Sequence, residues 1–148
     1  MRSETKNRKA RSGSAIIEMT IAVPLLVSLF LGCFQFGYAF YLYNELTQAV
    51  RAGGRYASVR HYLSLTETPT ADYINAVRNM VVYGHPEGGT VPVVRGLRPE
   101  HVTVQMMFEK NIPARVRVSI DNFSIGVFWD VVLRGKPWAE FVYLGVWG

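Results

Sequence analysis

MTIAVPLLVSLFLGCFQFGYAFYLYN, residues 19–44, is a run of 26 residues without a charged side chain. A helix over this run would be about 39 Å long, more than the roughly 30 Å hydrocarbon core of a bilayer. A cleaved secretory signal has an apolar region of only about 7–15 residues, followed by small residues at its cleavage site. This run is longer and ends in bulky side chains, and Tyr38, Tyr41 and Tyr43 suit a membrane–water interface. The run therefore predicts one transmembrane helix.

The positive charge of the chain is concentrated before this helix. Residues 1–13 carry five basic side chains and one acidic side chain, which accounts for +4 of the formal net charge of +5. The rest of the chain is nearly neutral, so we expect no nucleic-acid partner. Basic residues directly before an apolar segment keep that end in the cytoplasm. We therefore expect a cytoplasmic N-terminus and an extracytoplasmic C-terminal domain.

The helical pattern continues beyond the apolar run. Leu46, Val50 and Gly53 recur at helical spacing, which predicts one helix from about Ala15 to Ser58. Pro24 lies inside it and is expected to produce a kink, which a membrane helix tolerates. Gly53 and Gly54 together cost a helix about 2 kcal/mol relative to two alanines. The pair indicates either local fraying or close packing against another backbone.

The C-terminal part predicts one short helix. Apolar residues at helical spacing predict an amphipathic helix over Asp72 to Tyr83, with Thr70 or Asp72 as its N-cap and Gly84 at its end. Residues 62–70 before it and residues 85–99 after it are expected to be loops.

The last third of the chain alternates between apolar and polar residues. The alternation predicts strands over residues 101–109 and 115–121, joined by a hairpin connection at residues 110–113. Residues 123–133 are expected to form a third strand, and residues 139–146 a weaker fourth. The expected class is α+β: a long N-terminal transmembrane helix that extends into a small domain with an amphipathic helix and a 3–4-stranded antiparallel sheet, one face of which is covered.

The sequence shows no motif for catalysis, metal binding or cofactor binding. His61, His85 and His101 stand in different predicted elements without ligand spacing, and the single cysteine, Cys33, lies in the apolar run. Asp121 and Asp130 are expected on an exposed strand face or in a turn rather than as a catalytic pair. We therefore expect neither enzymatic activity nor a cofactor.

Two arginines form the only charged pattern on the predicted strands that suggests a partner. Arg115 and Arg117 fall on the outward face of the second strand, where they could bind an acidic partner. Solvated strand arginines are the commoner case.

Glu18 is the unusual carboxylate of the N-terminal region, because it stands at the start of the apolar helix. An ionised glutamate at the centre of a bilayer costs roughly 2.5–3.5 kcal/mol on insertion scales. Glu18 could snorkel toward the cytoplasmic surface, become protonated, or find a cation within the membrane. Cleavage between Gly13 and Ser14 would place a new α-ammonium group one helical turn before Glu18, or at the right depth to meet Glu18 of a shifted neighbouring subunit.

This arrangement resembles the class III signal of type IV prepilins, which has a basic leader, a glycine and a glutamate as the fifth residue after the scissile bond. The resemblance narrows to the TadE family, the minor pseudopilins of tight-adherence (Tad/Flp) pilus systems. The stretches that carry the resemblance are Gly13–Met19, Pro24–Leu26, Gly32, Phe36–Gly37 and Ala49 through Ala57. Met19 and Val50 depart from the usual family pattern without touching the glycine or the glutamate.

The resemblance implies a role for each part of the chain. Residues 1–13 would be a leader read by a prepilin peptidase, residues 14–60 the TadE-like transmembrane segment with its extension, and residues 61–148 a pilin-like outer domain. Glu18 would set the register between subunits. The implied partners are other minor pseudopilins, the major Flp pilin, the inner-membrane assembly platform and the lipid bilayer. An uncleaved, signal-anchored envelope protein and a membrane-tethered enzyme are the alternatives.

Overall fold

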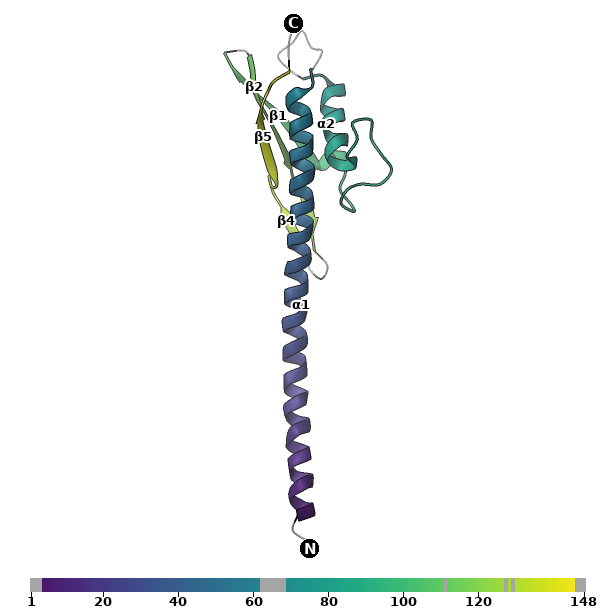
Figure 1. Ribbon diagram of the computed structural model, residues 1–148, viewed down its shortest axis with the longest axis vertical. Coiled ribbons are helices and arrows are strands. Elements are labelled where there is room, and N and C mark those ends of the chain that lie inside the picture. Colours follow the sequence, from purple (N-terminus) through teal and green to yellow (C-terminus); the bar gives the residue numbers. More distant parts are fainter. Residues whose placement is uncertain (1–3, 62–68, 111, 127, 129, 146–148) are drawn as a thin grey trace. The chain divides into compact units, whose positions relative to one another are not determined.

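The computed structural model describes residues 4–61, 69–110, 112–126, 128 and 130–145. It contains a long helix, a short helix and antiparallel sheets of three and two strands, which confirms the α+β class (Figure 1). The elements in chain order are α1 (Glu4–Val59), α2 (Ala71–Tyr83), the 3-10 helix η1 (Pro99–His101), β1 (Val102–Glu109), β2 (Ile112–Ile120), β3 (Phe123–Ile125), β4 (Val131–Leu133) and β5 (Trp138–Val142).

The chain divides into two compact units, Met1–Tyr38 and Ala39–Gly148, and α1 has residues in both. The helix begins at Glu4, earlier than the predicted start at Ala15, and ends one residue after the predicted end. In the first unit, the side chains described from Ala15 onward are nearly all exposed, including those of Ile16, Leu25 and Phe30. A helix so long, so apolar and so little buried fits a single-pass membrane anchor.

Pro24 lies inside α1 in this first unit. Because proline has no backbone N–H, the carbonyl of Thr20 loses its usual intrahelical donor. The Ser28 hydroxyl donates to the Pro24 carbonyl oxygen at 2.8 Å. The kink expected at Pro24 stays a prediction.

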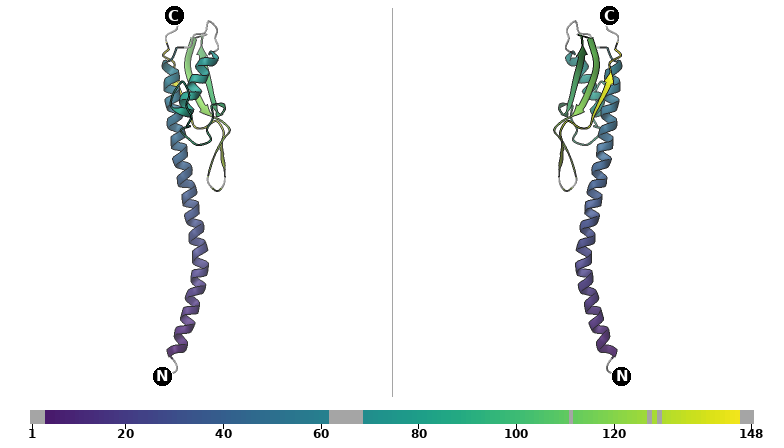
Figure 2. Two further views of the ribbon diagram at one scale, coloured as in Figure 1. Left: turned by 90° about the vertical axis from the view of Figure 1, so that its right-hand side faces the viewer. Right: turned by 90° about the vertical axis from the view of Figure 1, so that its left-hand side faces the viewer.

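The second unit is built around one apolar core. In Figures 1 and 2, the C-terminal part of α1, α2 and the three-stranded sheet run side by side. Leu46 and Val50 of α1, Val77 of α2 and Val116 and Val118 of β2 are fully buried in this core. The two helices cover one face of the sheet, so the expectation of a sheet with one covered face is confirmed.

The ends of α2 are formed by the residues that the sequence indicates. Thr70 is the N-cap, and its hydroxyl accepts a hydrogen bond from the Tyr73 N–H at 3.4 Å. Gly84 ends the helix with φ +75°, a left-handed conformation that strains residues with a Cβ. The structure places the helix at Ala71–Tyr83, one residue longer than predicted. Most of the loop predicted before it, at residues 62–68, lies outside the described residues.

The three-stranded sheet has the order β1-β2-β5, and both pairings are antiparallel. The alternation predicted for β2 is confirmed, since Val116, Val118 and Ile120 are buried while Arg115, Arg117 and Ser119 lie on the other face. β2 begins at Ile112 rather than Arg115, so the predicted connection of four residues was too long. The fourth predicted strand is β5, which covers Trp138–Val142 instead of residues 139–146.

The prediction of one strand over residues 123–133 was wrong. The chain forms two strands of three residues, β3 and β4, which pair with each other as a separate antiparallel sheet. Phe123 pairs with Leu133 and Ile125 with Val131, so the segment folds back on itself. In the sequence, Gly126 follows β3 and Asp130 precedes β4. Both are residue types that favour a turn.

Candidate functional site

The residues that the sequence marks for processing and assembly lie on the first part of α1. Gly13 and Ser14 are helical, and Glu18 follows one turn after Ser14. The Glu18 side chain is exposed. In the single chain it is therefore available to a group outside the chain.

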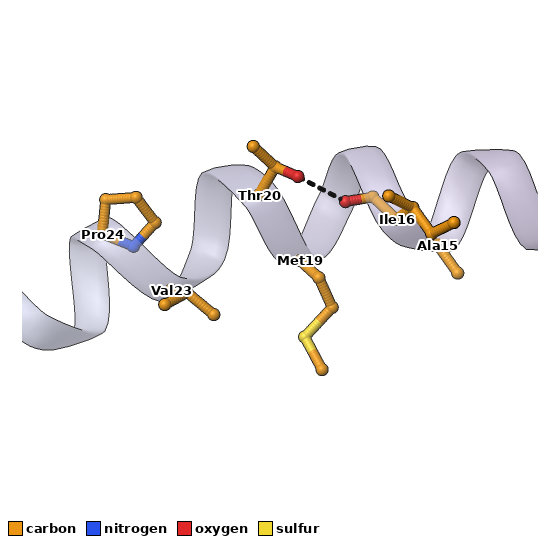
Figure 3. A pocket seen from close by; sticks show the side chains of 6 residues that line it. All are labelled: Ala15, Ile16, Met19, Thr20, Val23 and Pro24. Atoms are coloured by element: carbon orange, nitrogen blue, oxygen red, sulfur yellow. Dashed lines mark hydrogen bonds between the residues drawn. The ribbon is translucent and has the colours of Figure 1, made fainter.

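A shallow apolar depression lies on the same part of α1. Ala15, Ile16, Met19, Val23 and Pro24 line it, and Thr20 is its one polar side chain. Figure 3 shows that the Thr20 hydroxyl turns back to the helix and donates to the Ile16 carbonyl oxygen, at 2.8 Å. The depression therefore presents almost only hydrocarbon and suits lipid or another apolar helix rather than a polar substrate.

Gly53 and Gly54 lie on the last part of α1, in the second unit, and each is in close contact with a different neighbour. A Cβ on Gly53 would overlap Cγ2 of Val81 on α2. A Cβ on Gly54 would lie 2.7 Å from a ring carbon of Phe141 on β5. Both glycines are buried, so a side chain at either position would displace a packed neighbour.

Two tyrosines from elsewhere in the second unit hold the end of α1 and Arg60, the residue that follows the helix. The buried Tyr73 hydroxyl donates to the Ala57 carbonyl oxygen at 2.6 Å, and the Tyr143 hydroxyl donates to the Arg60 carbonyl oxygen at 3.0 Å. Helix C-termini leave their last carbonyls without intrahelical partners. Sequence reasoning missed both contacts, because nothing local to either tyrosine indicates which carbonyl it reaches.

The outward face of the sheet carries a three-residue ion-pair cluster. Arg117 donates to one Glu140 oxygen at 2.7 Å, and Arg115 donates to the other at 3.2 Å. The hydrogen bond from Arg117 and, to a smaller extent, the hydrogen bond from Arg115 lower the pKa of Glu140 below its usual value. The Arg117 guanidinium also lies 5.0 Å from the centre of the Trp138 ring. Neither arginine is simply solvated, and an acidic partner would have to compete with Glu140.

The described residues contain no cluster of three or more histidine, cysteine, aspartate or glutamate side chains that could hold a metal ion. His101 packs against the ring of Phe123, with centroids 5.5 Å apart, and Asp121 accepts a hydrogen bond from Ser119 at 3.2 Å. These contacts give both side chains structural roles.

Comparison with protein families finds a match over the first part of the chain. The family model described as TadE-like protein matches residues 13–55, which are 43 of the 148 residues. No curated protein and no solved structure matches the chain. The matched segment begins at Gly13, contains Glu18 and Pro24, and ends just after Gly53 and Gly54.

The match confirms the resemblance inferred from the sequence. The TadE-like family is a structural component of Tad pili and not an enzyme family, and it implies association with other components of that system. Residues 13–55 thus carry a segment similar to the TadE-like family, and this segment supports a TadE-like protein associated with the Tad pilus system.

Proposed function

We propose that the chain is a minor pseudopilin of the inner membrane that is needed to assemble a Tad/Flp pilus for surface attachment. The observation that carries the proposal is the family match, which begins at the glycine of the leader-like sequence and covers the apolar part of α1. The basic residues before Gly13 favour a cytoplasmic N-terminus. The second unit, from Ala39 onward, would then lie outside the cytoplasm.

A prepilin peptidase would cleave between Gly13 and Ser14. The new α-ammonium group of Ser14 would stand four residues before Glu18, about 6 Å along the helix axis. In a bundle of axially shifted subunits, this ammonium group can meet Glu18 of a neighbour. Leaving either charge unpaired in the membrane costs more than forming the pair gains, so the pair would select one register.

The partners of this assembly would be the prepilin peptidase, other minor pseudopilins, the major Flp pilin and the inner-membrane platform. The exposed apolar side chains of α1 would contact lipid before assembly and other helices after it. Gly53 and Gly54 would keep the second unit closely packed on α1 throughout.

The test is the intact mass and N-terminal sequence of the membrane-extracted protein, from cells with and without a prepilin peptidase. We expect a chain that starts at Ser14 only when the peptidase is present, and an uncleaved chain in Gly13→Ala. Gly32→Ala is the matched control, since a Cβ there meets no atom within 4 Å. A leader retained in every sample would contradict the proposal and indicate instead a signal-anchored envelope protein whose outer domain binds a ligand or partner.

A further inference from the structure

The β3–β4 hairpin exposes apolar side chains that the core of the second unit does not use. Phe123 and Ile125 point into the core, whereas Phe128, Val131 and Val132 are between 45% and 53% exposed. Each strand of the hairpin has only three residues, and within the described part of the chain neither strand pairs with the main sheet. Exposed apolar side chains gathered on one short hairpin indicate a binding surface rather than ordinary surface variation.

The hairpin lies at the end of the second unit where α1 enters it. Figures 1 and 2 show β3 and β4 below the main sheet, toward this end. The core of the second unit contains Phe123 of the hairpin, and Leu133 of the hairpin packs against it. The first turns of α1 in this unit pack against the same core through Ala39, Leu42 and Tyr43. Phe40 and Tyr41 in the same turns are 68% and 59% exposed. Two elements therefore present apolar and aromatic side chains at one end of the unit.

The charges next to the hairpin suit an anionic surface. Residues 126–136 contain one acidic side chain, Asp130, and two basic ones, Arg134 and Lys136. All three are exposed. Apolar side chains beside exposed basic ones are typical of segments that insert into the interface of a membrane with anionic lipids.

We propose that the β3–β4 hairpin is a second membrane contact, which inserts Phe128 into the interface of an anionic bilayer beside the point where α1 leaves it. The inference rests on the membrane placement of α1 in the proposed function. Phe128 and Val132 contact the acyl chains near the headgroups, and Arg134 and Lys136 bind lipid phosphates. The contact orients the second unit on the membrane surface until the subunit is extracted into a pilus.

The test uses single spin labels on the full chain, reconstituted in vesicles of phosphatidylcholine and phosphatidylglycerol. The free and exposed Cys33 is first replaced by Cys33→Ser. Labels are then placed by Phe128→Cys at the hairpin, by Ile21→Cys in the apolar part of α1 and by Val91→Cys at a valine that is 77% exposed. The readout is the accessibility of each label to oxygen, which enters lipid, relative to a nickel chelate, which stays in water.

We expect the oxygen-to-nickel ratio at position 128 to lie severalfold above that at position 91 and below that at position 21. Arg134→Gln with Lys136→Gln should lower the ratio at position 128 in the anionic vesicles, and the difference should shrink in vesicles of phosphatidylcholine alone. Each labelled protein must keep the circular dichroism spectrum of its Cys33→Ser parent.

Three results have distinct meanings. A water-like ratio at position 128 together with a lipid-like ratio at position 21 overturns the hairpin proposal and leaves the membrane anchor intact. Shielding from both reagents with spin–spin broadening means that a second copy covers the hairpin, which also overturns it. A water-like ratio at position 21 overturns the membrane placement on which both proposals rest.

Discussion

Single atoms decide how closely α1 packs in the second unit. Gly53 lies against Val81, a fully buried residue with a branched Cβ that has little rotamer freedom in a helix. An added methyl at position 53 would overlap Val81 Cγ2. Overpacking of this kind costs about 1–3 kcal/mol, whereas replacing a helical glycine by alanine gains at most about 1 kcal/mol.

We therefore expect Gly53→Ala to lower the free energy of unfolding by about 1 kcal/mol, measured by urea unfolding of the full chain in detergent micelles. In a Val81→Ala background the overlap is gone, and the same change should become stabilising through its helix propensity. If Gly53→Ala stabilises the parent protein as much as it stabilises the Val81→Ala protein, the close contact between Gly53 and Val81 is contradicted.

Glu140 gives the second unit an acid-sensitive contact. Because hydrogen bonds from Arg117 and Arg115 lower its pKa in the folded chain, its contribution to stability is present above the unfolded value, near 4.5. That contribution is lost as the pH falls through the lower folded pKa. Protonation removes the charge that both guanidinium groups bind.

Unfolding of the full chain between about pH 7 and pH 3 should therefore show a loss of stability below pH 4.5 that Glu140→Gln reduces. The variant should be less stable than the parent at neutral pH and approach it in acid. Glu100→Gln is the matched control, since its pair with Arg98 is largely exposed and at 3.4 Å. An equal effect of both changes would show that the acid sensitivity does not come from the sheet cluster.

At the scale of the elements, Tyr73 joins the start of α2 to the end of α1. Its hydroxyl is buried and reaches the Ala57 carbonyl at 2.6 Å, near the C-terminus of α1. Tyr73→Phe leaves that carbonyl without this donor, and an unpaired buried polar group costs about 1–3 kcal/mol. We expect a loss of that size in the free energy of unfolding.

The control for Tyr73→Phe is Tyr83→Phe, which removes the same atom from the other end of α2. Among the described residues, no hydrogen bond to the Tyr83 hydroxyl is found, and the side chain is partly exposed. This change should alter stability little. Equal losses in both variants would assign the effect to the removed oxygen rather than to the contact between the helices.

The same elements show what local sequence patterns can and cannot predict. The spacing of apolar residues, Thr70 and Gly84 together predicted α2 to within one residue, because caps and helical periodicity are local. One strand was predicted over residues 123–133, since a nearly continuous apolar run fits one strand as well as two paired ones. The pairing of Phe123 with Leu133 is the contact that decides between them.

The residues of the candidate site also divide into those that the local sequence indicates and those that only the fold brings together. Gly13, Glu18 and the apolar run after them lie within the segment that the family model matches, so they could be found by reading along the chain. Glu140 could not be assigned to Arg115 and Arg117, because their meeting depends on the order and register of β2 and β5. Arg117 pairs across the sheet with Glu140, 23 residues away in sequence.

At the scale of the whole molecule, the proposed assembly would depend on a charge that the single chain leaves exposed. Glu18 is the last acidic residue before Glu45, and its proposed partner is the α-ammonium group that the proposed cleavage would create at Ser14. Removing one member of a buried ion pair costs about 3–5 kcal/mol, because the other charge is left unpaired. Loss of about 3 kcal/mol corresponds to more than about a hundredfold in an association constant.

We therefore expect Glu18→Ala to be processed at Gly13 like the parent but to lose association with other Tad pilus components, measured by co-purification from detergent-extracted membranes and by the yield of pili. Glu18→Asp keeps the carboxylate and should restore part of both. Glu45→Gln removes the next carboxylate along α1 and should leave both unchanged. Normal pilus yield from correctly processed Glu18→Ala protein would contradict this prediction, because the charge pair would then contribute nothing that assembly needs. The register between subunits would in that case be set by packing along the apolar faces of α1.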